Sequence, residues 1–209
     1  MPNQRGRGSD RTLTRRRLLD AAADVFAERG FHDATLEEIV EQAGFTRGAF
    51  YSNFASKDEL FLAMIEDQNR ADAATTGAYL RAGATPLEVA LSDPMPADQR
   101  RRLDLVRLEF LLYCARRKEL QKQLRGGRET RKRLLADQVA SAALQFGAEL
   151  PMSTEDAADL ILAVNTEAQI VRLFDPGDDS KRESMYRALF EMLGFPSDTK
   201  SKKRPRKRR

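Results

Sequence analysis

Four residues between positions 47 and 52 are candidates for contact with the edges of DNA bases. An arginine can donate two hydrogen bonds to one guanine, which discriminates against a wrong base by about 1–3 kcal/mol. Glycine inside a helix costs roughly 1 kcal/mol relative to alanine, so it is expected where a backbone must approach a partner closely. A helix of about seven residues, spanning on the order of 10 Å, would suit the major groove. The alternative is an ordinary solvated helix face. The candidates are Arg47, Gly48, Ala49 and Ser52.

Five further residues are candidates for contact with DNA phosphates. Thr35 and Lys57 stand at expected helix starts, where free backbone N–H groups favour an anion. Lys57 is the most informative of them, because a cation at a helix start opposes the helix dipole and is poorly placed for stability. The whole set is Thr35, Thr46, Tyr51, Asn53 and Lys57.

The segment 35–59, TLEEIVEQAGFTRGAFYSNFASKDE, has the helix signals needed to position these side chains. Thr35 precedes Glu38 by three residues, and Ser56 precedes Glu59 by three. Each spacing is that of a capping box, in which two side chains satisfy backbone donors at a helix start. The segment therefore predicts helices that begin after residues 35 and 56.

A tight turn is expected between the first two helices, at Gly44 and Phe45. Gly44 suits the left-handed conformation that often ends a helix, and Thr46 can cap the helix that follows. Apolar residues then fall on one face of each helix, which are Leu36, Ile39, Val40 and Ala43 in the first and Phe50 and Phe54 in the second. Two short helices, a tight turn and a supporting helix together predict a helix-turn-helix.

A specific set of residues between positions 13 and 62 carries a family pattern. They are Ala22, Phe26, Gly30, Phe31, Thr35, Ala43, Gly44, Phe45, Thr46, Gly48, Phe50, Tyr51, Phe54, Lys57 and Leu60. With these residues the chain resembles the TetR family of bacterial transcriptional repressors. It departs from the family pattern at Val40, where alanine is frequent, and at Asn53, where histidine or tyrosine is frequent.

The resemblance implies a homodimer that places two recognition helices in successive major grooves of a palindromic, double-stranded DNA operator. It also implies a small-molecule effector enclosed by helices between residues 57 and 174, and a dimer bundle formed by the last two helices of each subunit. We expect the effector pocket to use Met64, Gln68, Phe110, Tyr113, Cys114, Asn165 and Gln169. We expect the dimer interface to use Leu160, Val164, Val171, Tyr186, Leu189 and Phe190.

The rest of the chain predicts further helices and no strands, so the expected class is all-α with about nine helices. A helix over 97–124, a break at Gly126-Gly127 and another helix over 128–146 follow from the apolar pattern. The predicted domains are a disordered basic arm (1–11), a three-helix helix-turn-helix domain (12–55), a larger helical effector-binding and dimerisation domain (56–195) and a disordered basic tail (196–209).

Charge is distributed unevenly along the chain. The formal net charge is +4, yet residues 200–209 contain eight basic residues and no acidic one. Without these ten residues the chain has 28 basic and 32 acidic residues, a net charge of −4. A second basic cluster consists of Arg5, Arg7, Arg11 and Arg15–Arg17. Both basic segments are poor in apolar residues, so we expect them to be disordered when unbound.

Membrane and catalytic functions have little support in the sequence. The longest apolar run, Phe110–Ala115, is far shorter than the roughly 20 residues of a spanning helix. The N-terminus lacks the apolar core of a secretory signal, and one cysteine, Cys114, fits a reducing cytoplasm. His32 is the only histidine, and there is no phosphate-binding loop or metal-ligand cluster. We therefore expect no enzyme, cofactor, metal or membrane partner.

Two alternatives to a ligand-responsive repressor remain open at this level. A ligand-independent architectural DNA binder would use the basic tail for counterion release and would discriminate weakly between sequences. A transcriptional activator of the same fold is also open, because the protein sequence does not give the operator position. The effector itself is expected to be medium-sized and largely apolar, since isolated polar groups interrupt apolar helix faces.

Overall fold

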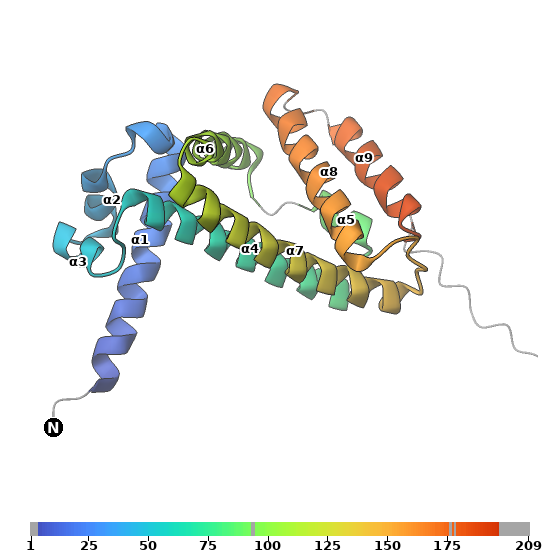
Figure 1. The fold of residues 1–209 in the computed structure, drawn as a ribbon, viewed down its shortest axis with the longest axis horizontal. Coiled ribbons are helices and arrows are strands. Elements are labelled where there is room, and N and C mark those ends of the chain that lie inside the picture. The colour runs from blue at the N-terminus through green and yellow to red at the C-terminus, as the bar shows by residue number, and fades with distance from the viewer. Residues whose placement is uncertain (1–3, 93–94, 176, 178, 197–209) are drawn as a thin grey trace, which may run out of the picture. The chain divides into compact units, whose positions relative to one another are not determined.

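The computed structural model describes the backbone of residues 4–92, 95–175, 177 and 179–196, with side chains described from residue 11 onward. Every regular element within these residues is an α-helix, which confirms the all-α prediction (Figure 1). No helix in these ranges is both long and apolar enough to span a bilayer. The helices are α1 (Gln4–Asp33), α2 (Leu36–Ala43), α3 (Arg47–Tyr51), α4 (Lys57–Arg81), α5 (Pro86–Leu91), α6 (Ala97–Ala115), α7 (Lys118–Phe146), α8 (Thr154–Phe174) and α9 (Asp179–Met192).

The chain divides into two compact units. Unit 1 comprises residues 1–70 and 95–127, and unit 2 comprises residues 71–94 and 128–209. α4 and α7 each contribute residues to both units. These units are defined by packing, and the functional domains predicted with a boundary at residue 55 stay a prediction. The predicted basic tail lies outside the described residues, apart from Pro196.

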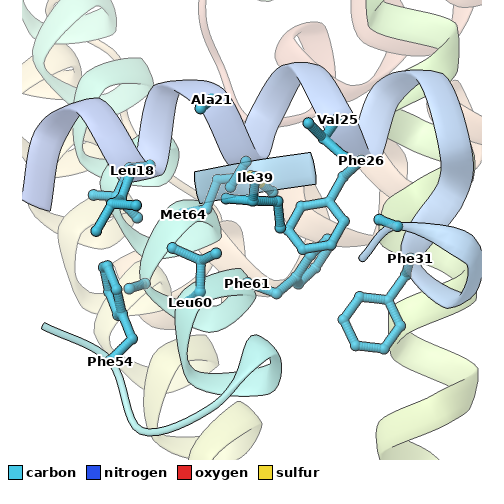
Figure 2. Close-up of a cluster of buried hydrophobic side chains, with 14 of the residues drawn as sticks. Leu18, Ala21, Val25, Phe26, Phe31, Ile39, Phe54, Leu60, Phe61 and Met64 are labelled. Carbon is cyan, nitrogen blue, oxygen red and sulfur yellow. The ribbon is translucent and has the colours of Figure 1, made fainter. Parts of the chain in front are cut away.

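Unit 1 is built around α1, which packs against α2 and α6. Figure 2 shows apolar side chains of α1, α2 and α4 meeting in one cluster. Each buried side chain contributes roughly 1.5–3 kcal/mol through removal of apolar surface from water. The cluster therefore fixes α2 on a frame made by α1 and α4. Its labelled members are Leu18, Ala21, Val25, Phe26, Phe31, Ile39, Phe54, Leu60, Phe61 and Met64.

The Phe31 ring joins this cluster to α6. Its centroid lies 5.2 Å from that of Phe61, 4.8 Å from that of Phe110 and 4.9 Å from that of Tyr113. Edge-to-face aromatic pairs of this kind contribute about 0.5–1.5 kcal/mol beyond their buried area. Phe31 follows Gly30, whose φ of 79° kinks α1.

The helix signals of the helix-turn-helix are confirmed. The Thr35 hydroxyl accepts from the Glu38 N–H, and the Glu38 carboxylate accepts from the Thr35 N–H at 2.9 Å, which completes the capping box. Gly44 ends α2 in the left-handed region, with φ of 72°. Half of the predicted box at Ser56 forms, because the Ser56 hydroxyl accepts from the Glu59 N–H at 3.1 Å. The reciprocal bond is shifted by one residue, since the Glu59 carboxylate accepts from the N–H of Ala55 at 2.7 Å. These short-range bonds set where α2 and α4 begin.

The N-terminus differs from the prediction of a disordered arm over residues 1–11. α1 already begins at Gln4, so residues 4–11 continue the helix that carries the core residues. Once a helix exists, each added residue fixes little further chain and gains one backbone hydrogen bond. Arginine is also a good helix former, so a basic composition does not stop the helix.

A second difference concerns the expected break at Gly126-Gly127, which lies inside the continuous helix α7. The break falls instead at Arg116 and Arg117, between α6 and α7. The Arg117 guanidinium lies 3.5 Å from the centroid of the Tyr113 ring, and the Gln121 side chain donates to the Ala115 carbonyl at 2.7 Å. Side chains therefore satisfy the open end of α6, whereas the cost of two glycines, roughly 1 kcal/mol each, is tolerated in α7.

Unit 2 contains α5, α8 and α9 with parts of α4 and α7. α9 packs against α5 and α8, and its Tyr186, Leu189 and Phe190 are buried in the apolar core. The Tyr186 hydroxyl donates to the side-chain oxygen of Asn165 in α8 at 2.7 Å. A buried phenol usually finds such a partner, so this bond joins α8 and α9 inside the core.

The buried thiol of Cys114 gives a first prediction. Burial raises the pKa of Cys114 to about 11, with Asp58 acting in the same direction and Arg117 opposing it. Because the thiolate is the reactive form, native protein at pH 8 should react with Ellman's reagent only as fast as it opens. Protein in concentrated guanidinium should react at once. Prompt stoichiometric labelling of the native protein would contradict this placement and favour a redox-sensing thiol.

Candidate nucleic-acid interface

The candidate recognition helix, α3, is short. It is held in place by a cap at its start and by one buried side chain. Thr46 caps it by accepting a hydrogen bond from the Ala49 N–H at 3.3 Å. Phe50 is completely buried and anchors the helix in the core of unit 1. A helix of five residues cannot be stable by itself in water. Its position therefore depends on this cap and this anchor.

The four predicted base-contact residues lie on the outer side of α3 and at its end. Arg47, Gly48 and Ser52 are exposed and Ala49 is half-buried. A Cβ atom added at Gly48 would meet only the Thr46 hydroxyl at 3.7 Å, which is ordinary contact. Packing within the chain therefore gives no reason for a glycine there. Close approach of a partner's surface would give one.

Arginines of α1 hold the end of α3, a role that the sequence analysis missed. Arg11 donates to the Ser52 carbonyl at 2.8 Å, and Arg15 donates to the Asn53 carbonyl at 3.3 Å. The Arg15 guanidinium also lies 4.3 Å from the centroid of the Phe54 ring. Cations at the carboxyl end of a helix complement its dipole. The two arginines are four residues apart, about one helical turn, so the sequence could have indicated that they lie on one face of a helix.

The predicted phosphate-contact residues have different local roles. The hydroxyls of Thr35 and Thr46 cap α2 and α3. Tyr51 is exposed, with its ring perpendicular to that of Phe50 at a centroid distance of 5.3 Å. The Asn53 side chain donates to the Ala49 carbonyl at 2.8 Å. Their contacts with phosphate stay predictions.

Lys57 makes contacts within unit 1 that the sequence did not indicate. Its ammonium group donates to the carbonyls of Phe31 at 2.7 Å, Ala34 at 2.9 Å and His32 at 3.2 Å. An ammonium group has three donors, and all three are directed at the 31–34 segment. Burial lowers the pKa of Lys57, against the opposing effect of Asp58 and Asp33. Contact of Lys57 with phosphate stays a prediction. Its structural role is to hold the 31–34 segment against α4.

Glu109 of α6 holds the same segment from another direction. Its carboxylate accepts from the Phe31 N–H at 2.8 Å. A Cβ atom at Gly30 would lie 3.0 Å from the same carboxylate oxygen, so the glycine permits this approach. Glu109 of α6 thus binds a backbone N–H of the segment before α2, and Lys57 of α4 binds its backbone carbonyls. Sequence reasoning had no signal for Glu109, which lies 78 residues from Phe31.

The predicted effector-pocket residues belong to both packing units, and their common pocket stays a prediction. In unit 1, Met64, Phe110 and Cys114 are buried in the apolar core. Tyr113, half-buried, donates to the Asp58 carboxylate at 3.2 Å, and Gln68 is half-buried. In unit 2, Asn165 is bound to Tyr186, and Gln169 is half-buried.

The predicted dimer-interface residues also remain to be tested. Val171, Tyr186, Leu189 and Phe190 are already buried within one chain, Val164 is half-buried and Leu160 is exposed. The large exposed apolar side chains of α8 and α9 are Leu160, Phe174 and Met192. Helical periodicity places Leu160 and Phe174, fourteen residues apart, on nearly the same face of α8. These three side chains are therefore exposed to solvent in the single chain.

Comparison with known proteins agrees with this local geometry. A family model described as bacterial regulatory proteins of the tetR family matches residues 18–64. The uncharacterized HTH-type transcriptional regulator YdgC of Bacillus subtilis is 54% identical over 54 residues, which are 26% of this chain and 28% of that protein. The HTH-type transcriptional activator FasR of Mycolicibacterium smegmatis is 42% identical over 64 residues, 31% of this chain and 29% of its own. The chain thus aligns with under a third of the length of these curated relatives.

Solved structures resemble a much larger part of the chain. A Saccharomonospora viridis protein in complex with choline superposes with a TM-score of 0.63 over 87% of this chain and 97% of its own. Its sequence identity is 16%. Likeness at that identity concerns the fold, and it extends the agreement beyond the helix-turn-helix.

The contacts of Lys57 give a second prediction. Lys57→Met should lower the stability of the protein by about 2 kcal/mol, because three carbonyl oxygens lose a charged donor. The measurement is the thermal unfolding midpoint, with Arg16→Met as control. Among the described residues, Arg16 forms ion pairs with Asp20 and Asp67 at the surface, and its own side chain is 59% exposed. Surface pairs of this kind contribute little. An unchanged midpoint for Lys57→Met, together with weaker DNA binding, would favour phosphate contact as its sole role.

Proposed function

We propose that this chain, whose N-terminal domain belongs to the TetR family of bacterial regulatory proteins, is a ligand-responsive transcriptional repressor that binds a palindromic operator as a homodimer. The observation that carries this proposal is the outward surface of α3, where Arg47 and Gly48 are exposed on a helix anchored by Phe50. Arg47 would bind a guanine, with Gly48, Ala49 and Ser52 against neighbouring bases. The relatives named as transcriptional regulators support the same function.

Phosphate contacts would set the position of the domain on the duplex. The proposed contacts are Tyr51, the last residue of α3, and four residues that flank α3 in the sequence, Thr35, Thr46, Asn53 and Lys57. Contacts of this kind fix register and orientation but carry no sequence information directly. The basic tail would add counterion release, and hence affinity that falls as salt rises. Action in the cytoplasm is part of this proposal.

Dimerisation is required by the proposed palindromic operator. Two recognition helices must reach major grooves separated by about 34 Å, one turn of the duplex. The exposed apolar residues of α8 and α9 support an interface there, because Phe174 and Met192 would otherwise remain in water. The buried positions Val171, Tyr186, Leu189 and Phe190 would support this interface from within each chain.

Release from DNA is proposed to follow binding of a small, mostly apolar effector. The choline complex of a protein with the same fold supports a ligand-binding role for such a helical body. Bound effector would lower the affinity for the operator, and bound operator would lower the affinity for the effector by the same factor. The coupling free energy for such a pair of sites is typically about 1–3 kcal/mol. Lys57 and Glu109 link α4 and α6 to the segment before α2. Either helix could therefore displace the recognition helix.

An activator of the same fold is the second candidate, since the relative FasR is named an activator. Genomic footprinting with the full chain tests both functions, because repression requires a site that overlaps a promoter and activation a site upstream of it. Protection spread over many unrelated sequences would instead favour the architectural DNA binder. A footprint at one palindrome would exclude that binder.

The role of Arg47 gives a third prediction. Arg47→Ala should weaken binding to the footprinted palindrome by about 10-fold or more and leave binding to unrelated DNA nearly unchanged, because a base contact is lost. The measurement is the ratio of the two dissociation constants at one salt concentration. An equal loss on both duplexes would make Arg47 a phosphate contact.

The exposed apolar side chains of α8 and α9 give a fourth prediction. Phe174→Glu combined with Met192→Glu should produce a folded monomer, because charges would be buried without partners in the dimer. Phe174 is 78% exposed and Met192 50% exposed in the single chain, so folding should be unaffected. Leu144→Glu, at an 86% exposed position of α7, is the matched control and should stay dimeric. Sedimentation velocity distinguishes monomer from dimer. A double variant that remains dimeric would show that the interface lies elsewhere.

A further inference from the structure

The guanidinium group of Arg47 is held by a carboxylate from the neighbouring helix. Its Nη1 atom lies 2.9 Å from Oε1 of Glu37, and the two side chains are 62% and 58% exposed. Glu37 is in the first turn of α2 and Arg47 is the first residue of α3. The ion pair therefore spans the turn of the helix-turn-helix, on the side that carries the candidate base contacts.

Glu37 lies in the first turn of α2, where a negative charge complements the helix dipole, but its ion pair with Arg47 adds little to the stability of the fold. Exposed pairs contribute a median of about 0–1 kcal/mol, and Glu38 already supplies the carboxylate of the α2 capping box. Glu37 also places a negative charge where phosphates would approach, which by itself opposes DNA binding. A function in orienting Arg47 fits both observations.

The geometry of a guanidinium group allows such orientation. The group is planar and has five N–H donors in a rigid fork. Glu37 engages Nη1, so the rest of the fork remains for a guanine. The rest of the fork is equally open to a phosphate, but the Glu37 carboxylate repels that anion and does not repel a neutral base. The pair therefore favours contact with the correct base over contact with phosphate.

We propose that Glu37 is a specificity-determining residue, which positions Arg47 for base contact and weakens its attraction to phosphates on unrelated sequences. The inference rests on the proposed function, because it requires a duplex that the protein prefers. By this proposal, discrimination between DNA sequences depends on a residue of α2 as well as on the residues of α3.

The experiment uses the full chain and a duplex selected by the wild-type protein from a random library. A scrambled duplex of the same composition is the reference. Dissociation constants for both duplexes, at one salt concentration, give a specificity ratio for wild type, Glu37→Gln, Arg47→Ala and the double variant. We expect Glu37→Gln to lower the ratio by about fivefold, the upper end for an exposed pair, mainly through tighter binding to the scrambled duplex. In the Arg47→Ala background, the same change should leave the ratio unaltered.

Glu41→Gln is the matched control, because Glu41 is an exposed residue of α2 with no ion pair among the described residues. It removes the same charge and should strengthen binding to both duplexes equally. Equal ratios for Glu37→Gln and Glu41→Gln, or additive effects of Glu37→Gln and Arg47→Ala, would overturn the inference alone. A wild-type protein that selects no sequence would overturn the proposed function and this inference together.

Discussion

The placement of the 30–34 segment is the constraint on which the helix-turn-helix depends. The Phe31 ring packs against Phe61 and Phe110, while Lys57 binds the carbonyls of the segment and Glu109 binds its N–H. This segment leads directly into Thr35, the cap of α2. The start of α2 is therefore set by α4 and α6 rather than by the turn alone. In the proposed function, a shift of either helix would reach the candidate base-contact surface through a few short, charged hydrogen bonds.

Much of the helix-turn-helix could be predicted because its signals are local. Thr35 with Glu38, the left-handed Gly44 and the Thr46 cap each act over three or four residues, so spacing alone identifies them. Burial of Phe50 and Phe54 followed from helical periodicity in the same way. The outer face of α3 is what remains after these residues are assigned to the core. Its amino-acid types then indicate contact with DNA.

The parts that sequence reasoning missed depend on contacts between distant residues. Arg11 and Arg15 bind carbonyls 41 and 38 residues away, and a basic composition alone suggested a disordered arm. Lys57 was assigned to phosphate because a cation at a helix start is unfavourable, whereas three carbonyls of another segment compensate it. The break at Arg116 is satisfied by side chains, so no glycine or proline marks it. Composition and local spacing do not indicate which distant residues will contact each other.

The five residues of α3 depend on the frame through Thr46 and Phe50, and the frame depends little on the outward residues of α3. A Cβ atom at Gly48 would meet only the Thr46 hydroxyl, at ordinary contact distance, and Ala49 and Arg47 contribute little to the core. After a gene duplication, substitutions at these positions could therefore accumulate without unfolding either copy. Two descendants would keep one scaffold and acquire separate operators. The pairing of position 37 with position 47 would then require the two helices to diverge together.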